Sequence, residues 1–549
     1  MEGSGLTVDL FRWLLALLPI VVLLVLMVQL RWTAPQAGPM GMFVAAAVAL
    51  FAFATPWETV AVAGAKGVWD AVFILYVVWP ALLLYRVTDQ AGGYEALRQG
   101  ITRFSRNELF LVVALGWVFS SFLQGIAGFG TPIAVVAPLL VAFGVRPVYA
   151  VVIPLIGHLW AKFFGTLGVS WFATLQVVDL ADPVATAFQS GLLLIIPCVL
   201  GGFMVVWMYG RWQALRHGWP LVLVIAAIQG GGQALFALWD PVLCTFLAAA
   251  ASVLALYPLS RWKRYAEPAE GITERPAMRD DSQKEDIARE APMGLAMSFV
   301  PYIVLSAVAV GTLAIDPLKD ALGAFTIGMP FPAVTTGFGI DNAAVEPYSP
   351  FAPLTHPGTF LLLTSIVTWL VFSARGYYRT WASGEGPTVL RATFKDAVPA
   401  SVPVIAFLVM ARLMDHSGQN EMLALGIAEV APAYVFAALS ASIGALGAFM
   451  TSSSTSSNVL FSDLQHTVAR LKGLPEAAII AAQSAGGSIG NAIAPANVVL
   501  GASTAGIAGR EGEILRKVIP WTIVALLVTG AATVLLVLAT GGLAMGGQS

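Results

Sequence analysis

Long runs of apolar residues, separated by short polar segments, extend along almost the whole chain. A helix needs about 20 mostly apolar residues to cross the roughly 30 Å hydrocarbon core of a bilayer. About 12 segments have this character, with several shorter ones beside them. The clearest are Phe11 to Leu30, Asp70 to Tyr85, Pro183 to Tyr209, Trp219 to Leu238, Val398 to Ala411 and Trp521 to Leu538. The pattern predicts an all-α polytopic membrane protein with about 12 to 14 transmembrane helices.

The composition agrees with this prediction. Of the 549 residues, 58% are hydrophobic and 11% are charged, whereas ordinary soluble domains hold about 25% charged residues. We therefore expect a lipid bilayer around the protein. Cys198 and Cys244 lie in apolar runs, and the chain contains no Walker loop, HExxH or CxxC motif. The sequence therefore supports neither ATP-driven transport nor metal chemistry. We expect the protein to bind no cofactor, no metal ion and no nucleic acid.

The distribution of Lys and Arg predicts which loops face the cytoplasm, because cytoplasmic loops carry an excess of these residues. The basic loops are Arg86 to Arg106, Arg211 to His217, Arg261 to Arg289, Arg375 to Lys395 and Arg510 to Lys517. Loops with no more than one Lys or Arg are Ser170 to Pro183, Trp239 to Asp240, Asp316 to His356 and Asp415 to Ala431. Tracing the chain through these loops predicts a multi-pass protein of the cell inner membrane with both termini outside.

The segment 265–293 divides the chain into an N-terminal transmembrane half, residues 1–264, and a C-terminal half, residues 294–549. From Tyr265 to Pro292 the chain is rich in charge and poor in aromatic residues, which is typical of a solvated linker. On this composition we expect a flexible cytoplasmic loop without a function of its own.

Each half contains one copy of an internal repeat, about 107–182 in the first half and about 432–508 in the second. Aligning Pro147 with Pro475, at an offset of 328 residues, gives both copies the same order of features. An apolar helix is followed by a Gly-rich or Ser/Thr-rich break, a basic turn with proline, and a small-residue helix with a second break. The first copy follows a cytoplasmic loop and the second follows an outer loop, so the repeats are predicted to be inverted. Inverted repeats with broken or re-entrant helices are typical of secondary transporters, whose site lies between the repeats near the middle of the bilayer.

The first break of each copy has the chemistry of a binding site. In the first copy Gly125, Gly128 and Gly130 allow a turn and the close approach of a ligand, and Pro132 begins the next half-helix, where its missing N–H is tolerated. The residues from Gly125 to Thr131 are predicted to contact the substrate. Free N–H groups at the start of a half-helix suit a carboxylate. The second copy has a polar run whose predicted substrate-binding residues are Ser452, Ser453, Ser454, Thr455, Ser456, Ser457 and Asn458. The alternative is that small residues let helices pack closely and that hydroxyls bond to their own helix.

Basic residues inside apolar segments are costly and usually functional. We expect Arg412 and Lys162 to pair with a substrate carboxylate; the alternatives are that Arg412 reaches outward or pairs with Asp415, and that Lys162 has a structural partner. Asp415 and His416 are predicted to handle a proton beside this cation, unless they only cap the outer end of the helix. His158 is a candidate to bind the substrate or a buried core histidine.

Three segments resemble the lactate permease family: LQGIAGFGTPIAVVAPLL, TSSSTSSNVLFSDLQ and GGSIGNAIAPANVVLGASTAGIAGREGEILRK. The resemblance implies a proton-coupled inner-membrane importer of L-lactate and related 2-hydroxymonocarboxylates, with the broad ion-transporter architecture and no cofactor. The family's breaks fall here on Gly125, Gly128, Gly130, Thr131 and Pro132, on Ser452 to Asn458, and on Gly486, Gly487, Gly490, Asn491, Pro495 and Asn497. Two departures stand out. Gln124 replaces a family glutamate, so that no carboxylate there carries a proton, and the stretch GHLWAKFFGTLG differs from usual lactate importers.

Three classes of function follow from these observations. The first is proton symport of L-lactate or a related small acid. The second is another transport mode on the same scaffold: export, exchange or sodium coupling of a related organic or sulfonated acid. The third is an intramembrane enzyme that uses Ser452 to Ser457 with His158 or His466, but no serine there has a base and an orienting group of its own. We predict a transporter and no enzyme, expect His356 and His466 to be structural, and leave the oligomeric state open.

Overall fold

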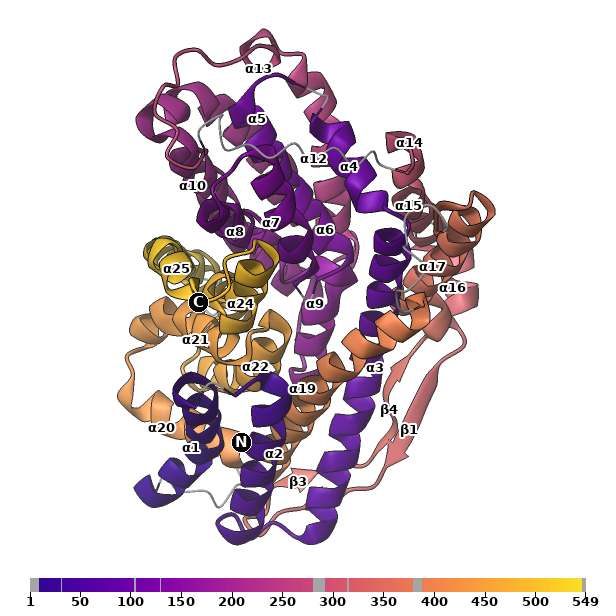
Figure 1. The fold of residues 1–549 in the computed structure, drawn as a ribbon. Coiled ribbons are helices and arrows are strands. Elements are labelled where there is room, and N and C mark those ends of the chain that lie inside the picture. The colour runs from indigo at the N-terminus through magenta and orange to yellow at the C-terminus, as the bar shows by residue number, and fades with distance from the viewer. Residues whose placement is uncertain are drawn as a thin grey trace.

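The computed structural model describes residues 9–30, 32–102, 105–128, 130–279, 292–313, 315–378 and 388–545, and Figure 1 shows a mainly helical protein. Within these residues, nine helices are long and apolar enough to cross a membrane, judged by length and composition. They are Leu10–Met27, Ala34–Phe51, Trp57–Gln90, Glu108–Ile126, Pro183–Ala237, Pro357–Ala374, Val389–Ser417, Ala433–Thr451 and Glu511–Gly541. The prediction of an all-α polytopic membrane fold is confirmed.

The longest of these segments contains a sharp turn. It consists of α10 (Pro183–Ala226), a π-helical turn (Ala227–Gly231) and α11 (Gly232–Ala237). At Gly210 and Arg211 the backbone leaves helical geometry, with φ of −158° and 49°. The chain then folds back, since a Cβ on Gly191 would lie 2.8 Å from Cα of Ala234. The segment therefore holds two antiparallel helices, in agreement with the two apolar runs predicted there.

One group of helices surrounds α3 and α19 (Figure 1). Its members are α1 (Leu10–Leu24), α2 (Ala34–Phe51), α3 (Trp57–Gln90), α17 (Pro357–Ala374), α19 (Val389–Ser417) and α20 (Gln419–Val430). A Cβ on Gly67 of α3 would lie only 2.5 Å from Cα of Val409, so the absence of a side chain there lets α3 and α19 approach closely. The apolar run predicted to begin at Asp70 in fact begins at Trp57, which places Lys66 and Asp70 inside the helix.

The first repeat begins with a helical hairpin. Its elements are α5 (Glu108–Val113), a π-helical turn (Ala114–Phe119), α6 (Ser120–Ile126), α7 (Thr131–Phe143), α8 (Pro147–Gly157), a 3-10 turn (Leu159–Ala161) and α9 (Gly165–Val177). The segment after α13 (Lys263–Ala266) contacts both ends of the hairpin: Asn107 Nδ2 donates to the carbonyl of Glu267 at 3.0 Å, and Arg279 N donates to the carbonyl of Gly144 at 2.8 Å. The ends of α5 and α7 therefore lie on the same side of the protein.

The second repeat has the same order of elements. They are α21 (Ala433–Thr451), α22 (Ser454–Leu471), α23 (Glu476–Gly490), a 3-10 turn (Asn491–Ile493) and α24 (Pro495–Thr504), and α25 (Glu511–Met545) follows. The end of this hairpin lies beside α20, since Lys472 Nζ donates to the carbonyl of Ala428 at 2.8 Å. In Figure 1, α5 and α13 lie at the top of the molecule and α20 lies near the bottom. The two hairpins thus enter from opposite ends, which is the arrangement predicted for inverted repeats.

The described part of the linker is packed against the first repeat rather than solvated. Tyr265 is fully buried, and Ile272, Ala277 and Met278 are nearly so. Arg275 Nη1 lies 3.0 Å from Glu108 Oε1, and Val145 forms an isolated antiparallel bridge with Met278. Charge-rich composition suggested a free loop, but a few apolar side chains are enough to hold residues 265–279 in place. Residues 280–291 of the predicted linker lie outside the described residues.

The loop 327–351 forms two small antiparallel ribbons that the sequence did not predict. Strands β1 (Ile327–Phe331) and β4 (Val345–Phe351) make one, and β2 (Val334–Thr335) and β3 (Asp341–Asn342) the other. The ribbon runs along α3 (Figure 1), where Trp69 Nε1 donates to the carbonyl of Ser349 at 3.2 Å. The remaining described elements are α4 (Gly93–Thr102), α12 (Cys244–Ser260), α14 (Leu295–Ser298), α15 (Val300–Leu313), α16 (Asp316–Gly323), a 3-10 turn (Pro353–Thr355) and a π-helical turn (Val25–Gln29).

Candidate functional site

The four breaks of the two repeats meet around one small cavity. Its volume is about 60 Å³. It is lined by Gln124, Gly130, Lys162, Gly165, Thr166, Val169, Ser170, Ser452, Ser453, Ser454, Thr455, Asn491 and Asn497. One lining residue is charged, and nearly all the others are small or carry an amide or hydroxyl group. A cavity with such walls suits a small ligand with hydrogen-bonding groups and one negative charge.

Glycine is required at the first break by the backbone geometry. Gly130 precedes α7 with φ of 87°, a conformation that residues with a side chain rarely adopt. Gly128 N donates to Thr166 Oγ1 at 2.8 Å, and a Cβ on Gly128 would lie 2.3 Å from the same oxygen. This contact fixes the first break against the second break of the same repeat.

The second break of the first repeat is a left-handed turn inside α9. Thr166, Leu167 and Gly168 have φ of 53°, 50° and 78°. Such a conformation costs roughly 1–2 kcal/mol for each residue with a side chain, and it persists only where the surrounding structure imposes it. The turn is fully enclosed, since Thr166 and Leu167 are buried. It presents Thr166 and, one helical turn later, Ser170 to the cavity.

In the second repeat the break is short and is followed by a capped helix. Ser452 has φ of 56°, and Ser453 Oγ accepts a hydrogen bond from Ser456 N at 3.2 Å as the N-cap of α22. Ser170 Oγ shares hydrogen bonds with Thr455 Oγ1 at 2.7 Å and with Ser454 Oγ at 3.2 Å. These hydroxyls join the two repeats directly across the cavity.

The fourth break supplies two asparagines. Asn497 Nδ2 donates to Asn491 Oδ1 at 2.7 Å, and Asn491 Nδ2 donates to the carbonyl of Ser452 at 3.3 Å. Ser452 Oγ accepts from Ala496 N at 3.2 Å. The two breaks of the second repeat are therefore braced against each other in the same way as those of the first.

Lys162 is the charged residue of the cavity wall. Its side chain follows the 3-10 turn Leu159–Ala161, and the residue is 6% exposed. Within the described part of the chain, its ammonium has no hydrogen-bond acceptor and no ion-pair partner. The structural partner considered as an alternative is thus absent from these residues. Basic groups in such surroundings mark the path of an anion by default.

The structure divides the predicted substrate-binding residues into two sets. Those that line the cavity are Gly130, Lys162, Ser452, Ser453, Ser454, Thr455 and Asn491. Those that do not are Gly125, Gly128, Thr131, His158, Arg412, Ser456, Ser457 and Asn458. Ser457 Oγ donates to the carbonyl of Gly444 at 2.7 Å, and Asn458 Oδ1 accepts from Gln483 Nε2 at 3.3 Å. The first half of the polar run thus faces the cavity, whereas the second half bonds to neighbouring helices.

His158 is fully buried, and neither of its ring nitrogens has a hydrogen-bond partner among the described residues. It precedes the 3-10 turn that carries Lys162 but is not part of the cavity wall. Several residues that line the cavity were not among the predicted substrate-binding residues: Gln124, Gly165, Thr166, Val169, Ser170 and Asn497. Gln124 and Asn497 lie in the recognised segments, and the run FGTLG around Gly165 and Thr166 carried the Gly/Thr signal of a break.

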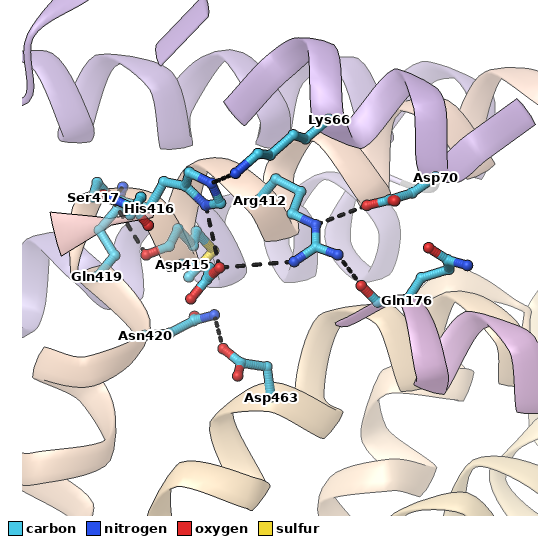
Figure 2. A network of polar contacts seen from close by, with 12 residues as sticks. Lys66, Asp70, Gln176, Arg412, Asp415, His416, Ser417, Gln419, Asn420 and Asp463 are labelled. Carbon is cyan, nitrogen blue, oxygen red and sulfur yellow. Dashed lines mark hydrogen bonds and ion pairs between the residues drawn. The ribbon is translucent and has the colours of Figure 1, made fainter. Parts of the chain in front are cut away.

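Arg412 belongs to a separate polar network, shown in Figure 2. Its Nε donates to Asp70 Oδ2 at 2.7 Å, and its Nη2 donates to the carbonyl of Gln176. Asp415, the partner considered from sequence, is 3.9 Å away. Asp70 from α3 thus already neutralises the guanidinium in this structure, and the pairing of Arg412 with a substrate stays a prediction.

His416 and Asp415 complete this network. His416 Nδ1 lies 3.2 Å from Asp415 Oδ2, and His416 Nε2 lies 3.1 Å from Lys66 Nζ. Tyr348 OH from β4 donates to Asp70 Oδ2 at 3.1 Å. Residues from α3, α9, α19 and the ribbon β1–β4 are thereby joined. A base and an acid at positions 66 and 70, one turn apart in an apolar helix, are the sequence signal that could have indicated this network.

The chain matches a family model described as L-lactate permease over residues 12–539. The glycolate permease GlcA of Escherichia coli (strain K12) is 26% identical, over 97% of this chain and 96% of that protein. The L-lactate permease of the same strain is 25% identical over 95% of both chains, and that of Bacillus subtilis (strain 168) is 24% identical over 95% of both.

Two solved transporter structures also align with the chain. The YdaH transporter of Alcanivorax borkumensis is 16% identical with a TM-score of 0.41, covering 84% of this chain and 85% of that one. MtrF of Neisseria gonorrhoeae, described as representing a class of antimetabolite efflux pumps, is 15% identical with the same TM-score, covering 83% of this chain and 80% of that one.

Proposed function

The chain belongs to the L-lactate permease family, and on that premise we propose that it imports L-lactate or a related small 2-hydroxymonocarboxylate by proton symport across the cell inner membrane. It is a multi-pass membrane transporter rather than an enzyme. The observation that carries the proposal is the cavity in which all four breaks meet and in which Lys162 is the charged wall residue.

The volume of the cavity supports a small acid as the substrate. A water molecule needs about 10–15 Å³ measured in the same way, so that the cavity has room for roughly four to six waters. L-lactate has about six non-hydrogen atoms. The carboxylate pairs with the Lys162 ammonium and receives further hydrogen bonds from the hydroxyls at the start of α22. The 2-hydroxyl is bound by the amides of Gln124, Asn491 or Asn497.

The names of the relatives agree with this class of substrate. Glycolate and L-lactate, named for the two Escherichia coli relatives, are both 2-hydroxymonocarboxylates and differ by one methyl group. Val169 is the aliphatic residue of the wall, and we propose that it contacts this methyl group. The alternatives are export, exchange or sodium-coupled movement of a related organic or sulfonated acid on the same scaffold.

Transport assays in proteoliposomes test the proposal. Purified protein should take up radiolabelled L-lactate down an inward proton gradient, and unlabelled glycolate should compete. Replacing the proton gradient by a sodium gradient should give no accumulation. Accumulation with sodium alone, or counterflow of a sulfonate but not of lactate, would favour the alternatives instead.

Lys162→Met tests the carboxylate partner. A hydrogen bond to a charged group contributes roughly 1.5–3 kcal/mol, so the apparent affinity for L-lactate should fall by about 10- to 100-fold. The matched control is Lys263→Met, at an exposed position of α13, which should bind as the wild type does. Binding is measured on purified protein in detergent, with the elution profile in gel filtration as the check of folding. Unchanged affinity in a well-folded Lys162→Met protein would refute the assignment.

A further inference from the structure

Among the described residues, no acidic side chain lies beside the buried Lys162. The other residues that line the cavity are uncharged. Of the helices packed against its turn, α6, α8 and α10 contain no Asp or Glu, and Glu476 at the start of α23 pairs with His466 at 2.6 Å. His158, four residues before Lys162, is fully buried and would repel a cation there if it were protonated.

Burial away from water disfavours a charged ammonium, and no neighbouring acid compensates here. The same amine becomes stable as an ammonium as soon as an anion occupies the cavity, because an opposite charge within a few ångströms favours the charged form. The proton and the anion therefore favour each other's binding, and this coupling is reciprocal.

We propose that Lys162 itself carries the symported proton, an inference that rests on the transport function proposed above. In the empty cavity the side chain is a neutral amine. When the carboxylate enters, the amine nitrogen takes up one proton and forms an N–H bond, and the resulting ammonium pairs with the anion. On release, this N–H bond breaks, and the proton and the carboxylate anion leave on the other side of the membrane, so that Lys162 returns to the neutral amine.

In this scheme the cavity has no net charge either when it is empty or when it holds the substrate. The empty site holds an uncharged amine, and the loaded site holds one cation and one anion. A residue that stayed positive would make the empty site charged and would oppose its return through the bilayer, where an unpaired charge is expensive. Transport by Lys162 is therefore electroneutral, with one proton for each monocarboxylate.

The network of Arg412 does not supply the same coupling. Arg412 already has Asp70 as its partner at 2.7 Å, and His416 already lies between Lys66 and Asp415 (Figure 2). None of these residues lines the cavity. An anion in the cavity thus gains no direct contact with their charges, whereas it meets Lys162 in the wall.

The variant Lys162→Arg tests whether residue 162 carries the proton or only pairs with the carboxylate. Arginine stays protonated at every relevant pH, so it still pairs with a carboxylate but has no proton to exchange. Exchange of labelled for unlabelled L-lactate should persist, whereas accumulation driven by a pH gradient should be lost. Lys66→Arg, at the second buried lysine, controls for the size of the guanidinium and should keep accumulation. Accumulation at the wild-type level by Lys162→Arg would overturn the proposal, as would its loss, with exchange retained, in His416→Gln.

Calorimetry on the wild type keeps the proposal testable even if the arginine variant misfolds. Binding of L-lactate at alkaline pH, measured in buffers of different ionisation enthalpy, should take up about one proton per molecule bound. Uptake should persist in His416→Gln. Binding without proton uptake would refute the role of Lys162 while leaving lactate transport intact. Absence of any binding or exchange in the wild type would instead refute the proposed function.

Discussion

Two basic residues inside apolar segments, Lys162 and Arg412, have opposite surroundings. Arg412 is held by Asp70, whose side chain is 0% exposed, and by the carbonyl of Gln176. Lys162 has no such partner among the described residues and lines the cavity. The same sequence signal therefore corresponds to two different arrangements: an ion pair that joins helices, and a basic group in a cavity wall.

The buried ion pair between Arg412 and Asp70 should contribute to stability because each charge neutralises the other. Removing one partner of a buried ion pair costs about 3–5 kcal/mol because the other charge is left unpaired, whereas removing both is much less damaging. Asp70→Asn should thus lower the unfolding temperature in detergent clearly, and Asp70→Asn combined with Arg412→Gln should recover part of the loss. If the double variant unfolded at the same temperature as Asp70→Asn, or at a lower one, the two charges would not be coupled.

At the scale of elements, close helix packing explains many of the small residues of the second repeat. A Cβ on Gly486 of α23 would lie 1.8 Å from the carbonyl oxygen of Ala441, and one on Gly444 of α21 would lie 2.2 Å from that of Gln483. The helices α21 and α23 therefore touch along their backbones. The alternative proposed from sequence, that small residues serve packing, holds for this helix pair, while the breaks beside it form the cavity.

Neighbouring glycines of α23 provide a matched test of this contact. Gly486→Ala should force α21 and α23 apart, at a cost of about 1–3 kcal/mol or more. At Gly487 the nearest atom to a Cβ is Ser457 Oγ at 3.4 Å, which is an ordinary contact. Gly487→Ala should therefore be tolerated, or even stabilise the helix by up to about 1 kcal/mol. The measurement is the unfolding temperature of both variants in the same detergent, and similar losses in the two would contradict the packing argument.

At the scale of the whole molecule, the cavity exists because two hairpins enter from opposite ends and meet. Each hairpin tip supplies part of the cavity wall, and the breaks that contain Lys162 and Thr166 and that contain Asn491 and Asn497 supply the rest. Ser170 and Thr455, which bond across the cavity, are 285 residues apart in the chain. A site of this kind is complete only when both repeats are folded together.

Cysteine labelling tests the predicted inversion. Arg106 is exposed before the first hairpin and Val430 is 83% exposed before the second, and the native Cys198 and Cys244 are buried. A membrane-impermeant maleimide should label Arg106→Cys from the cytoplasmic side and Val430→Cys from the outer side. Labelling of both positions from one side would exclude inverted repeats. The same experiment on residues near each terminus tests the prediction that both ends lie outside.

The sequence alone was enough to predict the helical membrane fold, the repeat and the positions of the breaks. Apolar length, helix-breaking glycine and proline, and runs of hydroxyl side chains are local properties, and the physics of a bilayer leaves few structures open to them. The start of α7 after Gly130 and the interruption at Ser452 were accordingly found near the predicted residues. The family resemblance was confirmed by a match over nearly the whole chain.

Only the tertiary structure decided which side chains meet. The pairing of Arg412 with Asp70 spans 342 residues, and no periodicity within either helix specifies a partner so far away. The start of α22 at Ser454 determines that Thr455 faces the cavity and that Ser457 bonds to α21, because successive residues of a helix point about 100° apart. The ribbon 327–351 and the packing of residues 265–279 depend in the same way on surfaces that exist only after the helices have assembled. A local pattern can therefore indicate that a polar group is needed, but the three-dimensional packing determines whether a protein group or a ligand satisfies it.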